Sequence, residues 1–153
     1  MNINNFTIKS QEVVQQAQQL AAENGHQAIE PGHILKALLE VDENVVPYIL
    51  KKVNVNLPQL NAKLDQLVAS YPKVAGSNQY LSNESSQVFQ KANTLLKEFK
   101  DEFVSIEHIF LALLSGKEKA AALLKDAGVN DKDTRAAIAE LRKGSRVTSA
   151  SAE

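Results

Sequence analysis

Two short motifs hold the residues of this sequence that are best suited to chemistry. One places Glu30 three residues before His33, and the other places Glu107 beside His108. A Glu-x-x-His pair from each of two helices is the ligand set of di-iron bundles, because the two side chains share one helix face. Ser105 stands where the second motif would need its glutamate, which breaks the pattern. A metal-dependent enzyme built on both motifs is therefore a minority hypothesis, and we expect the histidines to pack near helix starts.

Other catalytic patterns are missing from the sequence. A phosphate loop needs a glycine-rich string that ends in Gly-Lys and then Ser or Thr, whereas Gly116 and Lys117 are followed by Glu118. The chain has no cysteine, which removes thiolate nucleophiles and Cys-based zinc sites, and nothing resembles a nucleophile elbow. We therefore expect a non-catalytic protein that requires no cofactor.

The composition excludes several classes of partner. Lys and Arg total 17 against 18 Asp and Glu, so the net charge of -1 provides no basic field for nucleic acid or an anionic membrane. The longest apolar run, Ile109 to Leu114, is far shorter than the roughly 20 residues that cross a bilayer. No signal peptide is visible, and the lack of cysteine suits a reducing compartment, so a cytoplasmic location is expected.

The elements that position these residues come from an internal repeat. An offset of 75 residues aligns Thr7 with Ser82 and His33 with His108, and an offset of 74 continues the match from Ile49 onward. Apolar residues recur at helical spacing throughout, and no stretch alternates convincingly as a strand. Start signals fall near the same places in both copies: Thr7, Glu30, Val45 and Asn56, then Ser82, Ser105, Glu118 and Asn130.

These signals predict an all-α fold of two tandem, pseudo-twofold repeats with about four helices each. The predicted domain covers residues 1–143, with repeat 1 at about 6–70, a linker at 71–79 and repeat 2 at about 80–143. Residues 144–153 offer almost nothing to bury, so we expect them to be a mobile linker toward a further domain.

The paired segments EPGHILKALL (Glu30 to Leu39) and SIEHIFLALL (Ser105 to Leu114) resemble the Clp N-terminal domain, the double repeat that precedes the ATPase rings of Clp unfoldases. The resemblance covers nearly the whole chain, and the opening NNFTIKSQEVV is most similar to the ClpB-type disaggregase branch. It implies a module that contacts unfolded or aggregated polypeptides and hands them to the ATPase rings of the same polypeptide, which form a hexamer. An adaptor or co-chaperone is a further possible partner. The alternative is an adaptor- or substrate-docking N-domain of a protease-associated Clp unfoldase.

The resemblance also implies a set of site residues. Residues linked to substrate handling in the ClpB branch fall on Thr7, Asp101 and Glu107, and an apolar groove beside them falls on Phe89, Phe103 and Val104. Simpler interpretations exist, because a threonine at a helix start is often only a cap and acidic residues usually form a solvated edge. On this basis Thr7→Ala is expected to lower both stability and client affinity, whereas Glu107→Ala is expected to affect mainly affinity.

Overall fold

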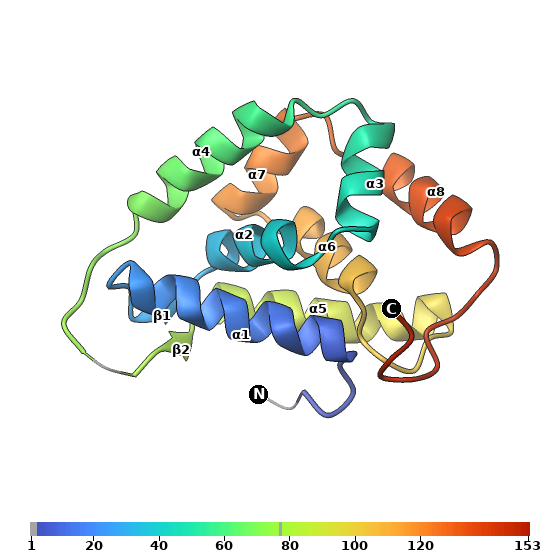
Figure 1. The fold of residues 1–153 in the computed structure, drawn as a ribbon, viewed down its shortest axis with the longest axis horizontal. Coiled ribbons are helices and arrows are strands. Elements are labelled where there is room, and N and C mark those ends of the chain that lie inside the picture. The colour runs from blue at the N-terminus through green and yellow to red at the C-terminus, as the bar shows by residue number, and fades with distance from the viewer. Residues whose placement is uncertain (1–2, 77) are drawn as a thin grey trace.

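The computed structural model describes residues 3–76 and 78–153, most of which lie in helices. Figure 1 shows these helices packed as one bundle. Along the described residues the elements are α1 (Ile8–Glu23), β1 (Ala28–Ile29), α2 (Pro31–Val41), α3 (Val45–Lys52), α4 (Leu57–Ala69), β2 (Tyr80–Leu81), α5 (Asn83–Phe99), α6 (Ile106–Ser115), α7 (Lys119–Asp126) and α8 (Asp131–Arg142). The predicted all-α fold is confirmed. Three residues of the predicted domain and linker, Met1, Asn2 and Ser77, lie outside the described residues.

The two repeats form equivalent halves, α1 to α4 and α5 to α8. In each half the long first helix packs on the second, so α1 contacts α2 and α5 contacts α6. The second helices, α2 and α6, also contact each other and form the centre of the bundle. Every residue from Ile106 to Leu114 is buried, because this mostly apolar helix is covered on all sides.

The predicted helix starts are confirmed by cap geometry. Thr7 Oγ1 accepts a hydrogen bond from the Ser10 backbone N–H at 3.1 Å, and its repeat counterpart Ser82 accepts one from Ser85 at 3.0 Å. The central helices are capped by histidine, because the Ser105 N–H donates to His108 Nδ1 at 2.8 Å. Both motif histidines therefore sit in the first turn of a buried helix, as expected from the sequence.

Two short pairings between extended segments join the halves. β1 and β2 are parallel, with Ile29 opposite Leu81, and a further parallel bridge joins Phe6 to Val104. The two pairings are related by the repeat, since the same offset aligns Phe6 with Leu81 and Ile29 with Val104. Strands this short leave no alternating pattern, which is why the sequence did not reveal them. Their effect is to bring the start of α1 beside the start of α6, and the start of α5 beside the start of α2.

Among the described residues, no helix has both the length and the apolar character that a membrane crossing requires.

Candidate functional site

The site begins where two helix starts meet. The Thr7 N–H donates to the Val104 carbonyl at 3.0 Å, and the Val104 N–H donates to the Asn5 carbonyl at 2.7 Å. This pairing places the first turn of α1 against the first turn of α6. We call the surface around this junction the Thr7–Glu107 site; its residues are Thr7, Ile8, Asp101, Glu102, Ile106 and Glu107.

A buried histidine holds Asp101 in place. Because the Ser105 N–H donates to His108 Nδ1, the proton of the neutral ring is on Nε2, which lies 2.7 Å from Asp101 Oδ2. Burial lowers the pKa of His108, an effect that the hydrogen bond from His108 to Asp101 partly opposes. Both side chains are fully buried. His108 is therefore a positioning residue for the Asp101 carboxylate.

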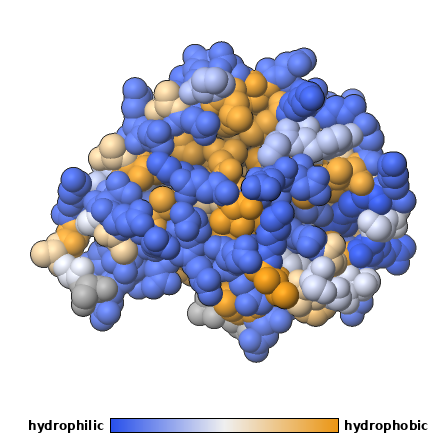
Figure 2. All heavy atoms as spheres, viewed as in Figure 1, coloured by the Kyte–Doolittle hydropathy of each residue, from blue (hydrophilic) through white to orange (hydrophobic). Residues whose placement is uncertain are grey.

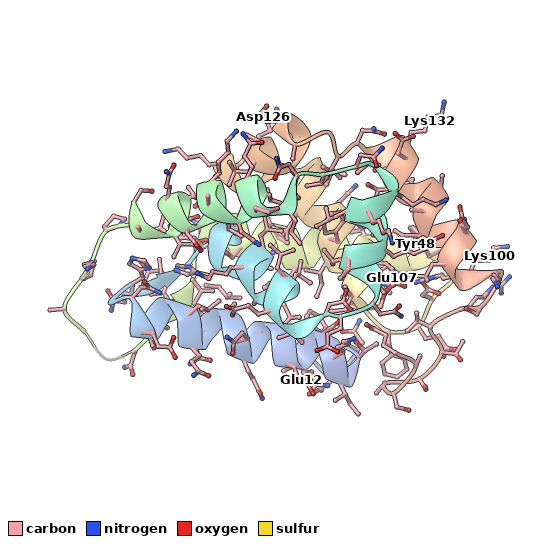
Figure 3. All side chains as sticks on the ribbon, turned by 45° about the horizontal axis from the view of Figure 1, so that its top comes forward. Glu12, Tyr48, Lys100, Glu107, Asp126 and Lys132 are labelled. Carbon is pink, nitrogen blue, oxygen red and sulfur yellow. The ribbon has the colours of Figure 1, made fainter. Side chains whose placement is uncertain are left out.

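Arg142, at the end of α8, connects the two acidic residues of the site. Its Nη1 lies 2.8 Å from Asp101 Oδ2, and its Nη2 lies 2.7 Å from Glu107 Oε2. The Asp101 and Glu107 side chains are 0% and 6% exposed, so one guanidinium serves two buried carboxylates. Figure 3 shows Glu107 drawn into the bundle, while Glu12 on α1 points outward.

This arrangement corrects the interpretation of the acids as a solvated edge. Asp101 and Glu107 are buried, and only Glu102 between them is exposed. In this geometry Glu107→Ala is expected to lower stability as well, because it removes a buried partner of Arg142, while its effect on affinity stays a prediction. Glu107 retains one polar atom that could accept a further hydrogen bond, since its Oε1 is buried and has no hydrogen-bond partner among the described residues.

Residues 144–153, which we call the tail, return to this site. After α8 the chain reverses through Lys143 and Gly144, which have φ values of 50° and 88°. Figure 1 shows the tail running from the end of α8 back toward the start of α1. The tail contains a buried residue, since Val147 is 5% exposed. The expectation that this segment has almost nothing to bury is therefore wrong at Val147.

Hydrogen bonds fasten the tail at three points. At the first, the Val147 N–H donates to Asp101 Oδ1 at 2.9 Å and the Val147 carbonyl accepts from the Glu102 N–H at 2.8 Å. At the second, the Ala150 carbonyl accepts from the Ile8 N–H at 2.8 Å. The third is the Glu153 carboxyl group, which contacts Thr7 and Ile106. The first two contacts involve main-chain atoms of the tail, so they do not depend on its side chains.

The Glu153 carboxyl group lies between the two helix starts. Its Oε1 accepts a hydrogen bond from Thr7 Oγ1 at 2.7 Å and lies 3.3 Å from the Ile106 N–H, while Oε2 lies 3.5 Å from that N–H. Burial of the group and the nearby Glu107 charge raise the pKa of Glu153 to about 7, against the hydrogen bonds from Thr7 and Ile106 and the charge of Lys9. Glu153 as a residue is exposed, so burial applies to its carboxyl end rather than to the whole side chain.

The predicted apolar groove is only partly present. Val104 and Phe89 are 0% and 4% exposed, and Phe89 packs on the Phe6 ring with centroids 5.7 Å apart. These two residues belong to the core, because the Phe6–Val104 bridge draws both segments inward. Phe103 is half-buried, and Ile8, which was not predicted, is 53% exposed beside the tail. A shallow hollow of about 280 Å³ lies here, lined by Ile8, Lys9, Glu12, Ala150, Ser151 and Glu153.

The residues of the metal hypothesis are used differently. His33 Nδ1 accepts from the Glu30 N–H at 2.9 Å, and His33 Nε2 lies 2.9 Å from His26 Nδ1. The ring nitrogens of His108 are engaged in the same way by Ser105 and Asp101. Within the described part of the chain, no group of three or more His, Cys, Asp or Glu residues is arranged to hold a metal ion.

Comparison with known proteins gives matches along the whole chain. The Clp repeat (R) N-terminal domain matches residues 5–127. Over 153 residues the chain is 53% identical to chaperone protein ClpB of Bacteroides thetaiotaomicron and 46% identical to chaperone protein ClpB of Porphyromonas gingivalis. These matches cover 100% of this chain and 18% of each relative, so the chain spans less than a fifth of their length.

Solved structures share the fold. The Hsp104 N-terminal domain from Candida albicans is similar with a TM-score of 0.84 and 23% identity, over 96% of this chain and 97% of that one. A complex of the ClpV N-domain with VipB peptide is similar with a TM-score of 0.75 and 22% identity, over 99% of this chain and 91% of that one. At these identities the likeness concerns the fold alone.

Proposed function

The chain belongs to the Clp repeat N-terminal domain family, and we propose that it is the substrate-binding N-terminal module of an ATP-dependent protein disaggregase. In this role it contacts unfolded or aggregated polypeptides and hands them to ATPase rings of the same polypeptide, which assemble as a hexamer. Its identity of 53% to a ClpB chaperone over the whole chain supports the disaggregase branch. The module itself carries out no catalysis.

The single observation that carries the proposal is the tail at the Thr7–Glu107 site. There an irregular stretch of polypeptide is held mainly through its N–H and carbonyl groups, by Asp101 Oδ1, the Glu102 N–H and the Ile8 N–H. Recognition of main-chain groups tolerates many sequences, because every residue except proline presents the same donor and acceptor. Tolerance of this kind is what a binder of unfolded chains needs.

The proposed layout follows the repeat. Residues 1–143 form the domain, with repeat 1 at about 6–70, a linker at 71–79 and repeat 2 at about 80–143. The bounds of α1 to α4 and of α5 to α8 are compatible with this division. Residues 144–153 then have two roles, as the connection toward the ATPase rings and as a segment that contacts the domain.

The test is an NMR titration of the chain with reduced, carboxymethylated α-lactalbumin, which stays unfolded without aggregating. We expect saturable shifts of the backbone amides of Thr7, Asp101, Glu102 and Ile106. A matched control is the equivalent edge of the other half, followed through the amides of Ser82 and Glu30, which should not move. A folded spectrum that is unchanged at saturating polypeptide would contradict the proposed function.

Adaptor docking in a protease-associated Clp unfoldase is the second candidate. It is favoured by a separate groove of about 390 Å³ between α2, α3 and α4. Figure 2 shows apolar surface gathered in the upper part of the molecule, over these helices. The groove is lined by Lys36, Leu39, Glu40, Pro47, Leu50, Leu57, Asn61, Leu64 and Asp65. Shifts confined to this groove in the titration would favour adaptor docking over direct client binding.

A further inference from the structure

The tail accepts hydrogen bonds from helix N–H groups that would otherwise be hydrated. The first N–H of a helix has no partner within the helix, and it carries part of the positive end of the helix dipole. Ile8 and Ile106 supply these first N–H groups for α1 and α6, and both point at the tail: Ile8 at the Ala150 carbonyl and Ile106 at the Glu153 carboxyl group. The positive ends of the two helix dipoles therefore face oxygen atoms of the tail, the Ala150 carbonyl and the Glu153 carboxyl group.

The hydroxyl of Thr7 is oriented toward the tail. A hydroxyl group has one proton, and Thr7 Oγ1 lies close to both Ser10 Oγ at 2.9 Å and Glu153 Oε1 at 2.7 Å. An ionised carboxylate cannot donate, so when Glu153 is ionised the Thr7 proton goes to Glu153 Oε1 and the Ser10 hydroxyl donates to Thr7. Thr7 therefore caps α1 with its lone pairs and holds the tail with its proton.

The equivalent edge of the other half is built differently. There α2 begins with Pro31, which has no N–H, so the donor that Ile106 supplies in α6 does not exist. Ser85 Oγ, the counterpart of Ser10 Oγ, donates to the Ile29 carbonyl at 2.6 Å. Two halves with the same fold thus differ in the groups that hold a carboxyl side chain.

A buried acceptor remains unused beside the tail. Within residues 3–76 and 78–153, no group donates a hydrogen bond to the buried Glu107 Oε1, and Glu107 itself is 4% exposed. Placing a second carboxylate near this atom is unfavourable, whereas a protonated carboxyl or a carboxamide supplies a donor and removes the like charge. The electrostatics of the site therefore favour a neutral hydrogen-bonding side chain over an ionised one.

We propose that residues 147–153 are an internal ligand of the Thr7–Glu107 site, and that a client polypeptide must displace them to bind. The site takes a segment with one apolar side chain, then a turn of small residues, then a carboxyl or carboxamide side chain. The competition with clients rests on the proposed function. The occupancy of the site by the tail does not.

The attachment is of the kind that can be displaced. Between Val147 and Glu153 the tail forms a turn, with the Ala152 N–H donating to the Ser149 carbonyl at 3.3 Å, and its residues there are small. Val147 is its only buried side chain, so little apolar surface holds it in place. A client that presents the same main-chain groups can form the same hydrogen bonds with Asp101, Glu102 and Ile8.

The test compares Glu153→Ala with Glu153→Gln, and uses Thr148→Ala as the control because Thr148 is an exposed tail residue. Occupancy is read without client from the amide of Glu102, which contacts Val147 and not Glu153. Client affinity is then measured by titration with carboxymethylated α-lactalbumin. If the tail covers the site in nine of ten molecules, complete release raises apparent client affinity about tenfold, because only the uncovered fraction binds.

We expect Glu153→Ala to shift the Glu102 amide and raise client affinity several-fold, about three- to tenfold by the same reasoning. Glu153→Gln is expected to lower client affinity, and Thr148→Ala to change neither quantity. An unmoved Glu102 amide in Glu153→Ala would overturn the proposed occupancy. A shifted amide with unchanged client affinity would overturn the competition and leave the proposed function standing. Client binding to neither the original chain nor the released variant would remove the proposed function, while the Glu102 amide would still report occupancy.

Discussion

Arg142 gives the sharpest test of how the site is held together. Arg142→Ala removes the guanidinium that lies between Asp101 and Glu107, whose side chains are 0% and 6% exposed. Removing one member of a buried ion pair leaves an uncompensated buried charge and costs about 3–5 kcal/mol. Two carboxylates are left here, so we expect the loss to fall in that range. The free energy of unfolding is measured by urea denaturation at pH 7.

Arg135 on the same helix is a matched control. Its guanidinium pairs with Glu98 at 3.0 Å and Asp131 at 2.8 Å, and all three side chains are at least 37% exposed. Exposed pairs of this kind contribute about 0–1 kcal/mol. Both arginines also lie over the Phe99 ring, at 5.3 and 5.6 Å from its centroid, so each substitution removes a similar cation–π contact. Equal m-values and unfolding energies within about 1 kcal/mol of each other for the two variants would refute the buried-pair reasoning.

The helix caps, the Glu153 carboxyl group and the His33 ring each give a further prediction. Thr7→Ala and Ser82→Ala each remove a helix cap worth about 1 kcal/mol in thermal or urea unfolding, but only Thr7→Ala should shift the Glu102 amide. Equal amide responses would contradict the role of Thr7, which Thr7→Ser should preserve. Tail docking is expected to be strongest below pH 4.5 and to weaken as pH rises through about 7, because docking raises the pKa of Glu153; a Glu153 carboxyl that titrates near 4.5 by NMR would contradict this. The facing charges in that titration are Lys9 and Glu12 on α1 and Glu107 on α6. Burial, with the nearby His26 and Lys36, lowers the pKa of His33 to about 4, so the stability that neutral His33 contributes is present above pH 6.5 and lost as pH falls through about 4. A His33 ring that titrates at or above pH 6 would show this reasoning to be wrong.

The helices could be predicted from the sequence because their signals are local. Caps such as Thr7 and Asn56 lie within three residues of the N–H groups that they satisfy. Asn54 and Gly128, which the offset of 74 aligns, are residue types that tolerate the left-handed conformation that ends a helix, and their φ values are 56° and 103°. Local chemistry of this kind repeats from one copy to the next, so each copy supports the interpretation of the other.

The site was less predictable because its contacts are distant in sequence. Arg142 reaches residues 35 and 41 positions earlier, and no spacing rule links a helix end to that loop. Phe89 and Val104 resembled groove residues by position, yet the bridge between Phe6 and Val104 buries that edge. The tail was judged by its few apolar side chains, whereas hydrogen bonds to its main chain and to Glu153 provide most of its contacts. Composition does not encode those bonds.

Pro31 at the start of α2 has a consequence for stoichiometry. A duplicated fold would be expected to offer two equivalent docking places and to bind two ligands. At the start of α2, Pro31 has no backbone N–H to donate to a ligand, whereas Ile106 supplies that N–H at the start of α6. Among the described residues, the duplicated scaffold therefore has one edge, not two, that can hold a carboxyl side chain in this way. Under the proposed function, one domain would then engage one client segment at a time.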